Sequence, residues 1–322
     1  MMSHKGAKAM KFNLNCWNEQ DELKTVVVCS PSILEVSDQQ TATDVQWEKQ
    51  VDQEKARRNH EEMVSVMEKA GVIVVDYSTY LSTDDLALNE KLINRCFVRD
   101  LACVFGHILL PGAAGTSMRR PEYFQSHRIF QEWFDEKKFL IQANNKLKAL
   151  EYGDVMVLNK DAVFINTGIR TSIESVEALQ GHLFQAGFSE IGLIDLPRRP
   201  DTMHLDMNGN VAGADVFIAK SYMSYFPVLV RREDGFSFQM TGDFLNRHGF
   251  AVEWIEHIKH TIADINFLNL NPETILISTK ANKSLFKNHP TLKKKKLVEV
   301  EVNELENGGG GIRCMTLPLE RG

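Results

Sequence analysis

Residues 63–75 are Met63-Val64-Ser65-Val66-Met67-Glu68-Lys69-Ala70-Gly71-Val72-Ile73-Val74-Val75, in which one glycine separates a helical pattern from an apolar strand. Glycine just past a helix end supplies the left-handed residue that closes the last turn, and an extended apolar segment follows. The same order recurs in residues 176–195, around Gly187, and in residues 242–254, around Gly249. Three such units predict an α/β fold.

Further apolar segments lie between these units and are typical of strands. They are residues 24–29, 155–158, 162–165, 274–277 and 297–302. The interleaving indicates several βαβ-like modules arranged around a centre, although periodicity alone does not show closure. Residues 35–60 are polar and helix-prone, which predicts an exposed excursion. The run Lys293-Lys294-Lys295-Lys296 predicts a solvated entrance to the strand after it.

Composition narrows the class of protein. The chain has 322 residues, 43% hydrophobic and 25% charged, which is average for a globular protein that can bury a large core. A net charge of −6 gives no basis for a nucleic-acid or anionic-membrane partner. No apolar run approaches the about 18 residues of a membrane span. Because no Pro-, Gly- or Ser-rich linker divides the chain, we expect a single domain over residues 1–322.

Cysteine usage predicts the compartment. Five scattered cysteines form no CxxC pair, which is typical of reduced thiols in the cytoplasm. The N-terminal segment 1–8 lacks the apolar region of a signal peptide. No cluster has the spacing of zinc ligands, so we expect neither a metal nor another cofactor.

Charged residues gather in four short segments. They are Phe97-Val98-Arg99-Asp100, Leu150-Glu151-Tyr152-Gly153-Asp154-Val155, Met203-His204-Leu205-Asp206-Met207 and Gly310-Gly311-Ile312-Arg313-Cys314. Taken singly, they would be a surface pair, a turn, an exposed strand face and a buried structural cysteine. At strand spacing, His204 and Asp206 would point to the same side. Together they supply one nucleophile, one imidazole and several carboxylates, as a Cys/His hydrolase requires.

The surroundings of Cys314 indicate the charge of the substrate. Four consecutive glycines, 308–311, let the backbone approach a ligand closely, and Arg313 beside the cysteine would favour its thiolate. Several acids around one thiol make sense only with a cationic substrate, because otherwise they would raise the cysteine pKa and suppress the nucleophile.

The order and spacing of the four segments resemble the guanidino-group-modifying superfamily. Arginine deiminases are more similar than dimethylarginine dimethylaminohydrolases or amidinotransferases. The resemblance runs from the strand at residues 23–28 to Cys314 and the Met-Thr-Leu-Pro run after it. It implies an α/β propeller of five pseudo-symmetric ββαβ modules, with the active site in the central channel and a small guanidino compound as substrate.

The resemblance also implies catalytic roles. Cys314 matches the nucleophile that forms a covalent thiouronium intermediate, and His204 matches the general acid and base. Asp100 and Asp206 match the carboxylates that grip the guanidinium, whose planar fork of donors suits them. Glu151 matches a further acid near the guanidinium and the histidine.

Other matching positions concern the far end of the substrate. Asn94, Arg119 and Arg170 coincide with positions that hold the α-carboxylate of L-arginine in arginine deiminases, and converging arginines suit a carboxylate. Asp154 matches a supporting acid. Without the resemblance both arginines would be assigned to the surface, and Arg120 is the neighbouring alternative to Arg119.

The chain departs from the family pattern in three places. Tyr152 stands where a glycine is typical, which leaves two alternatives: its ring reshapes the pocket rim, or it is merely tolerated. Gly309 stands where an arginine is typical, and the chain is too short for the helical insertion domain. These departures leave the exact substrate open, and also whether the protein is a homo-oligomer.

The resemblance favours hydrolysis of L-arginine to L-citrulline and ammonia. The alternatives are an arginine dihydrolase, a dimethylarginine-type hydrolase, an amidinotransferase and a non-catalytic guanidino-binding protein. Amidinotransferases usually have isoleucine in place of Leu205 and lack the Arg-Cys-Met-x-x-Pro ending. A non-catalytic protein would have lost Cys314 or His204, and both are present.

Overall fold

The computed structural model describes residues 12–256, 258 and 260–322; the segment 1–8 lies outside them. Within the described part, the strands form five sheets. In order across each sheet they are β16 (Leu317–Arg321), β1 (Leu23–Val28) and β2 (Ile73–Asp76); β3 (Ala102–Phe105) and β4 (Ile108–Pro111); β11 (Gly235–Met240), β10 (Pro227–Arg232), β7 (Glu190–Ile194), β6 (Ala162–Asn166) and β5 (Val155–Val157); β12 (Ala251–Ile255), β9 (Val216–Lys220) and β8 (Gly209–Ala212); and β13 (Leu268–Asn271), β14 (Thr274–Ser278) and β15 (Lys296–Val300).

Helices connect and cover these sheets. The α-helices are α1 (Gln39–Asp44), α2 (Gln53–Lys69), α3 (Thr83–Asn89), α4 (Arg120–Trp133), α5 (Ile173–Ala186), α6 (Thr241–Arg247), α7 (Thr261–Ile265), α8 (Ser284–Lys287) and α9 (Asn303–Glu306). Four 3₁₀ turns matter below: η2 (Val98–Leu101), η4 (Ile141–Lys146), η5 (Tyr152–Asp154) and η7 (Leu205–Met207). No helix of the described residues is both long and apolar enough to cross a membrane.

One pairing order recurs in the sheets. An antiparallel pair is followed by a helix and by a third strand parallel to the second, as in β5, β6 and β7. The triplets β8, β9, β12 and β13, β14, β15 repeat it, and so do β16, β1 and β2. In the unit that begins with β3 and β4, a single parallel bridge between Leu109 and Phe139 stands in place of the third strand. The predicted α/β class is confirmed, with one ββαβ-like unit for each sheet.

The three predicted helix–glycine–strand units are confirmed. Helix α2 leads through Gly71 (φ 89°) to β2, α5 through Gly187 (φ 111°) to β7, and α6 through Gly249 (φ 91°) to β12. All three glycines are left-handed, a conformation that costs other residues a steric clash of Cβ. Local sequence therefore determines where each connecting helix ends.

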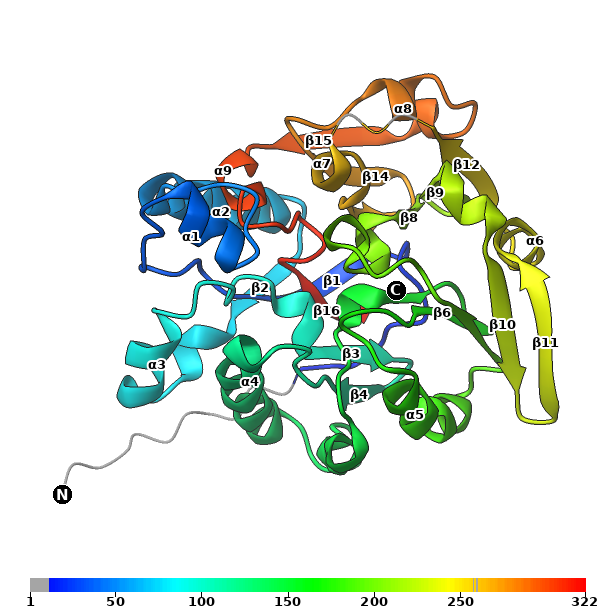
Figure 1. Cartoon of the computed structure of the whole chain (residues 1–322), viewed down its shortest axis with the longest axis horizontal. Helices are drawn as coiled ribbons and strands as arrows, with labels where there is room; N and C mark the ends of the chain where they lie inside the picture. The colour runs from blue at the N-terminus through cyan, green and yellow to red at the C-terminus, as the bar shows by residue number, and fades with distance from the viewer. Residues whose placement is uncertain (1–11, 257, 259) are drawn as a thin grey trace.

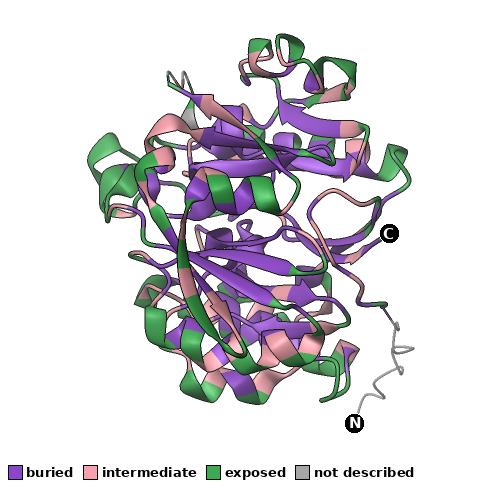
Figure 2. Cartoon of the chain, turned by 90° about the vertical axis from the view of Figure 1, so that its right-hand side faces the viewer, coloured by how far each residue is buried: buried purple, intermediate pink, exposed green. Residues whose placement is uncertain are grey.

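The sheets face the middle of the molecule, and α2, α4, α5 and α6 lie on the outside (Figure 1). Buried residues are concentrated in the strands, and exposed ones on the outer faces of the helices (Figure 2). Apolar clusters fill the space between each sheet and its helix; Val26 of β1, for example, shares a cluster with Met63 and Met67 of α2. Burying each such side chain contributes about 1.5–3 kcal/mol.

The excursion at residues 35–60 is only partly exposed. Helix α1 and the start of α2 have exposed faces, but Trp47 between them is only 6% exposed. The prediction of an exposed segment is therefore wrong for Trp47, because its indole N–H donates a hydrogen bond to the buried side chain of Asn94. The lysine run is confirmed as a solvated entrance at three positions: Lys293, Lys294 and Lys296 are exposed, and Lys296 begins β15. The prediction is wrong for Lys295, because its side chain is only 8% exposed and pairs with Glu273 over 2.9 Å.

Candidate active site

The site is built from the turns that precede the first strand of each unit. Asp100 lies in η2 before β3, and Glu151 lies at the start of η5 before β5. His204 and Asp206 come with η7 before β8, and Cys314 comes shortly before β16. The repeated unit therefore brings residues that are far apart in sequence to the middle of the molecule.

His204 and Asp206 do not share one face of a strand, so that expectation is wrong. His204 is extended, and a 3₁₀ turn begins at the next residue. Leu205 is buried in the apolar core, which fixes the turn. The imidazole faces Glu151, and the Asp206 carboxylate faces Cys314.

Cys314 is surrounded by polar partners. Its Sγ lies 3.6 Å from Oδ2 of Asp206 and accepts a hydrogen bond of 3.1 Å from Nδ2 of Asn266. The Cys314 amide donates to Oδ1 of Asn266 over 3.0 Å. Oδ1 of Asp206 is buried and has no hydrogen-bond partner in the described part of the chain. A buried acceptor without a partner is rare, and it suits a ligand with N–H groups.

The surroundings of Cys314 favour the protonated thiol over the thiolate. Burial raises its pKa well above the ordinary value, and the carboxylates of Asp206 and Asp100 raise it further. Arg313 lowers this pKa, but too little to offset the other causes. Its guanidinium donates instead to Asp206 (2.8 Å), Glu19 (2.9 Å) and the Val155 carbonyl. The expectation that Arg313 favours the thiolate is therefore confirmed in direction, but burial and the two carboxylates outweigh the effect of Arg313 on the Cys314 pKa.

His204 carries a proton. Its Nε2 lies 2.9 Å from Oε2 of Glu151 and 3.9 Å from Oδ1 of Asp100. Burial lowers the His204 pKa, but the carboxylates of Asp100, Glu151 and Asp154 outweigh burial and raise it to about 10. Burial raises the pKa of Glu151, but the bond to His204 and the charge of Arg119 outweigh it and keep that pKa low. The ionised carboxylate of Glu151 thus lies beside the protonated imidazole of His204.

Gly153 determines how closely these groups approach. Its amide donates to Oδ1 of Asp100 over 2.8 Å. An added Cβ would lie 2.6 Å from Nδ1 of His204 and 3.0 Å from Oδ1 of Asp100. Only glycine allows both side chains their positions.

Tyr152 and Asp154 point away from the cavity. The Tyr152 hydroxyl donates to the Pro111 carbonyl, and its ring packs on Phe105, so of the two alternatives the ring is tolerated and does not reshape the pocket rim. Asp154 accepts from Asn166 (2.7 Å) and from the Leu205 amide (3.1 Å). Burial raises the Asp154 pKa to about 7. This acid supports the η7 turn rather than a ligand.

A cavity of about 50 Å³ joins most of the predicted residues. Its lining includes Cys314, His204, Glu151, Asp100, Asn94, Arg119 and Arg170. Arg119 donates to Asp100 (2.5 Å) and Glu122 (2.9 Å), and Arg170 lies 3.4 Å from Glu151. Both arginines are buried, so the surface account of them is wrong. The alternative Arg120 is exposed and faces a different cavity.

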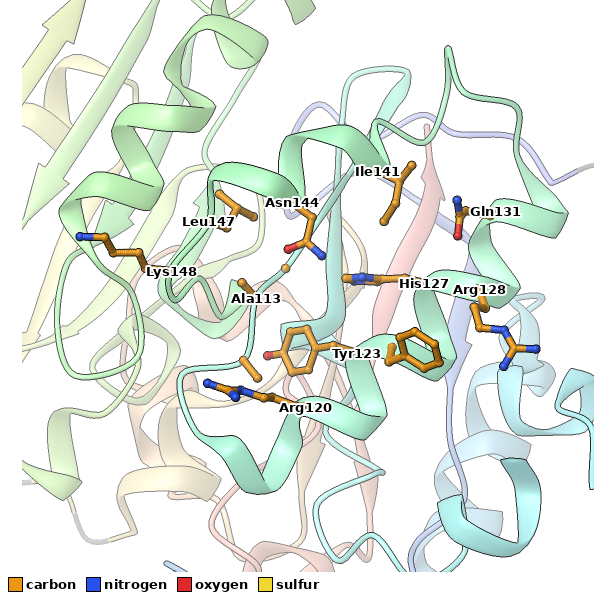
Figure 3. A pocket seen from close by; sticks show the side chains of 13 residues that line it. Ala113, Arg120, Tyr123, His127, Arg128, Gln131, Ile141, Asn144, Leu147 and Lys148 are labelled. Carbon is orange, nitrogen blue, oxygen red and sulfur yellow. The ribbon is translucent and has the colours of Figure 1, made fainter. Parts of the chain in front are cut away.

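That second cavity is larger, about 470 Å³, and lies between α4 and η4 (Figure 3). Neither cysteine nor carboxylate is among the described residues that line it. Its His127 bonds the Leu101 carbonyl (2.8 Å), and burial lowers the His127 pKa to about 4. Arg128 and Lys148 at its edges already pair with acidic side chains. The smaller cavity is therefore the candidate active site.

One group in the described part of the chain could hold a metal ion. Ligand atoms of Asp100, Glu151 and His204 lie within 4.8 Å of one another. A metal requires neutral imidazole, whereas the raised pKa of His204 keeps it protonated at neutral pH. The acids are better matched to an organic cation whose N–H groups donate to them.

Several residues of the site were missed by sequence reasoning. They are Glu19, Gln46, Trp47, Glu122 and Asn266. A signal existed for Asn266, which stands just before β13 as Asp100 stands before β3. Glu122 lies in the first turn of α4, and the others come from connecting segments; no spacing rule identified any of these residues.

Comparison with known proteins identifies the family of the chain. A family model described as arginine deiminase matches residues 77–234 and 255–321. The arginine deiminase of Staphylococcus aureus (strain JH9) is 28% identical over an alignment of 202 positions, which covers 53% of this chain and 47% of the relative. The chain thus spans about half the length of the curated relatives it matches.

Solved structures show the same fold. Dimethylarginine dimethylaminohydrolase from Pseudomonas aeruginosa, a cysteine-to-serine mutant complexed with citrulline, is 15% identical with a TM-score of 0.67, covering 92% of this chain and 99% of that one. An amidinotransferase of saxitoxin biosynthesis from Microseira wollei is 15% identical with a TM-score of 0.66, covering 96% and 97%. On the family match over most of its length, the chain belongs to the arginine deiminase family, within the guanidino-group-modifying superfamily.

Proposed function

We propose that the protein is a cysteine-dependent hydrolase that converts L-arginine to L-citrulline and ammonia. One observation carries the proposal: the sulfur of Cys314 shares a small cavity with a protonated imidazole and several carboxylates, and Oδ1 of Asp206 beside it has no partner among the described residues. A guanidinium ion would supply both the missing donor and the missing positive charge.

The guanidinium would lie between Asp206 and Asp100. Its N–H groups would donate to Oδ1 of Asp206 and to Asp100, which now binds Arg119 and the Gly153 amide. A cation there opposes the two carboxylates that raise the Cys314 pKa, so the thiolate forms when substrate is bound. The nucleophile is therefore activated by its own substrate.

In the first half-reaction the Cys314 sulfur forms a bond to the guanidinium carbon. His204, protonated at neutral pH, gives its proton to the departing nitrogen as that C–N bond breaks. Ammonia leaves, and a covalent thiouronium group remains on the sulfur. Glu151 holds the imidazole in place through its bond of 2.9 Å.

In the second half-reaction a water molecule replaces ammonia. The now neutral His204 takes a proton from this water, whose oxygen bonds to the thiouronium carbon. The C–S bond then breaks, Cys314 leaves as thiolate and the ureido product is released. We assign Arg119, Arg170 and Asn94, which line the same cavity, to the α-carboxylate of the substrate.

We also infer that the five sheets are the blades of a pseudo-symmetric ββαβ propeller, and that residues 1–322 form one catalytic domain without a helical insertion. The recurring strand pairing supports the first inference. The placement of a site residue ahead of the first strand of each unit supports the second.

The test is mass-spectrometric product analysis after incubation with L-arginine, with and without glycine as an acceptor amine. We expect citrulline and ammonia in equal amounts in both samples. Cys314→Ala should give no product yet still bind L-arginine, since the carboxylates remain.

Each other product identifies a different enzyme. Ornithine without glycine would indicate a dihydrolase, and a guanidinylated glycine would indicate an amidinotransferase. Release of dimethylamine from dimethylarginine, with arginine left intact, would move the assignment to that substrate. Turnover by Cys314→Ala would refute the nucleophile.

A further inference from the structure

We propose that Gln46 and Trp47 position Arg170 and Asn94, which are assigned above to the α-carboxylate at the far end of the substrate. Gln46 and Trp47 would thereby set a preference for substrates that carry a carboxylate at that end. This inference rests on the proposed function. The two residues belong to a segment, residues 45–49 between α1 and α2, that we call the strap. The family match begins at residue 77, so the strap lies outside the matched ranges.

The strap is fastened at both ends. The Gln46 amide donates to the Thr43 carbonyl over 3.0 Å, and Gln46 is left-handed (φ 67°), which is uncommon for a residue with a side chain. The amides of Glu48 and Lys49 both donate to the carbonyl of Asn307. Asn307 directly precedes the four glycines that lead to Cys314, so the strap is tied to the nucleophile's loop.

The Gln46 side chain orients Arg170. Its Oε1 accepts a short hydrogen bond from Nη2 of Arg170, while Nη1 of that arginine faces Glu151 at 3.4 Å. A neutral amide holds the guanidinium without neutralising it. Arg170 therefore keeps a charge that a substrate carboxylate can use.

Trp47 determines which atom of Asn94 faces the cavity. The indole Nε1 can only donate, and it donates to Oδ1 of Asn94 over 2.9 Å. The amide Nδ2 is left over, and in the described part of the chain it has no hydrogen bond to protein. Asn94 thus presents a donor, which suits a carboxylate and not an ammonium group.

The strap also forms the wall between two cavities. The cavity at Cys314 has about 50 Å³, and an outer cavity of about 390 Å³ is lined by Gln46, Trp47 and Asp201 among others. Gln46, Met203 and Gly309 line both. A Cβ at Gly309 would lie 3.3 Å from the Gln46 carbonyl, so glycine allows the strap to lie close over the site.

Two ligands separate this role from a structural one: L-arginine, and agmatine, which lacks the carboxylate. Calorimetry would measure their binding to Cys314→Ala and to the same protein carrying Gln46→Ala, Gln46→Glu or Trp47→Phe. Gln46→Ala should weaken the binding of L-arginine about tenfold, which is the effect of losing one charge-assisted hydrogen bond. The affinity for agmatine should change less than about twofold.

Gln46→Glu gives the sharpest result. The new carboxylate neutralises Arg170 and attracts the ammonium of agmatine, so L-arginine should bind more weakly and agmatine more tightly. Trp47→Phe, which keeps a ring but loses the N–H, should also weaken L-arginine selectively. Gln50→Ala is the matched control, because Gln50 is exposed and lines neither cavity.

Equal changes for both ligands, or no change, would overturn the strap's role, as would failure of both ligands to bind Cys314→Ala. Turnover by the unmodified protein is a separate measurement, and it tests the proposed function. Selective binding changes together with no product from any guanidino substrate would refute the hydrolase and leave the strap's role standing.

Discussion

Cys314 combines a nucleophilic sulfur with surroundings that hold its proton. Burial, Asp206 and Asp100 all raise the Cys314 pKa, and Asp206 is the nearer carboxylate at 3.6 Å. The same carboxylate is the strongest candidate to grip the substrate. Asp206 thus suppresses the thiolate of Cys314 and is proposed to bind the cation, and two measurements on one variant can separate these effects.

Asp206→Asn should abolish turnover and at the same time speed alkylation of Cys314 at fixed pH. The neutral amide no longer balances a guanidinium, but it also no longer raises the thiol pKa. Peptide mapping after iodoacetamide treatment at pH 8 would measure the rate at Cys314. Asp195→Asn, at an exposed position, should alter neither turnover nor alkylation. Slower alkylation in Asp206→Asn would contradict the assigned cause of the pKa shift.

Arg313 is a structural cation at the centre of the molecule. It is 1% exposed and bonds Asp206, Glu19 and the Val155 carbonyl. Arg313→Lys cannot make these bonds in one plane, so we expect a loss of about 3 kcal/mol or more in the free energy of unfolding. Urea unfolding would measure it. Arg57→Lys, at an exposed pair on α2, should cost far less; equal losses would contradict the central role of Arg313.

At the scale of elements, the 3₁₀ turns before the strands position the chemistry, and a glycine in one of them should be indispensable. Gly153→Ala in η5 would push a methyl group against His204 and Asp100, so we expect the turnover rate to fall at least about 100-fold with the fold retained. Activity assays with circular dichroism would check both parts.

A second glycine is the matched control. Gly181 lies exposed in α5, and nothing lies within 4 Å of an added Cβ. Gly181→Ala should keep full activity and stabilise the protein by about 0.5–1 kcal/mol, because alanine loses less backbone entropy in a helix. Near-normal turnover of Gly153→Ala would show that the imidazole can move without loss.

For the whole molecule, the buried charges around His204 make the free energy of unfolding depend on pH. The folded His204 pKa of about 10 exceeds the unfolded value of about 6.5, so its contribution is complete below pH 6.5 and is lost as pH rises toward 10. Asp154 and Glu122, whose pKa values burial raises to about 7, have ionised before the upper part of this window.

The stability advantage of the unmodified protein over His204→Gln should therefore shrink between pH 7.5 and 9.5, by up to about 1.4 kcal/mol per pH unit. Urea unfolding of both proteins at three pH values would measure it. Taking the difference cancels other groups, such as Lys220, whose pKa burial lowers to about 8. A difference independent of pH would mean that His204 is neutral in the folded protein.

The sequence by itself determined the local structure and the set of candidate reactive residues. Helix ends at Gly71, Gly187 and Gly249 follow from left-handed backbone, a property of the residue and its neighbours alone. The spacing of the four charged segments, with the family resemblance, was enough to select Cys314 and its partners. Both are short-range information that a single chain carries in its order of residues.

Only the tertiary structure decided which side chains reach the centre. Tyr152 turns away to Pro111, Arg119 turns in while Arg120 turns out, and Asn266 and Trp47 arrive from segments far from the four charged ones. The direction of a side chain in a turn depends on the packing of elements that lie well apart in the sequence, such as Tyr152 against Pro111, 41 positions away. Local pattern does not contain that information, because the contacts that fix it form only when the five sheets meet.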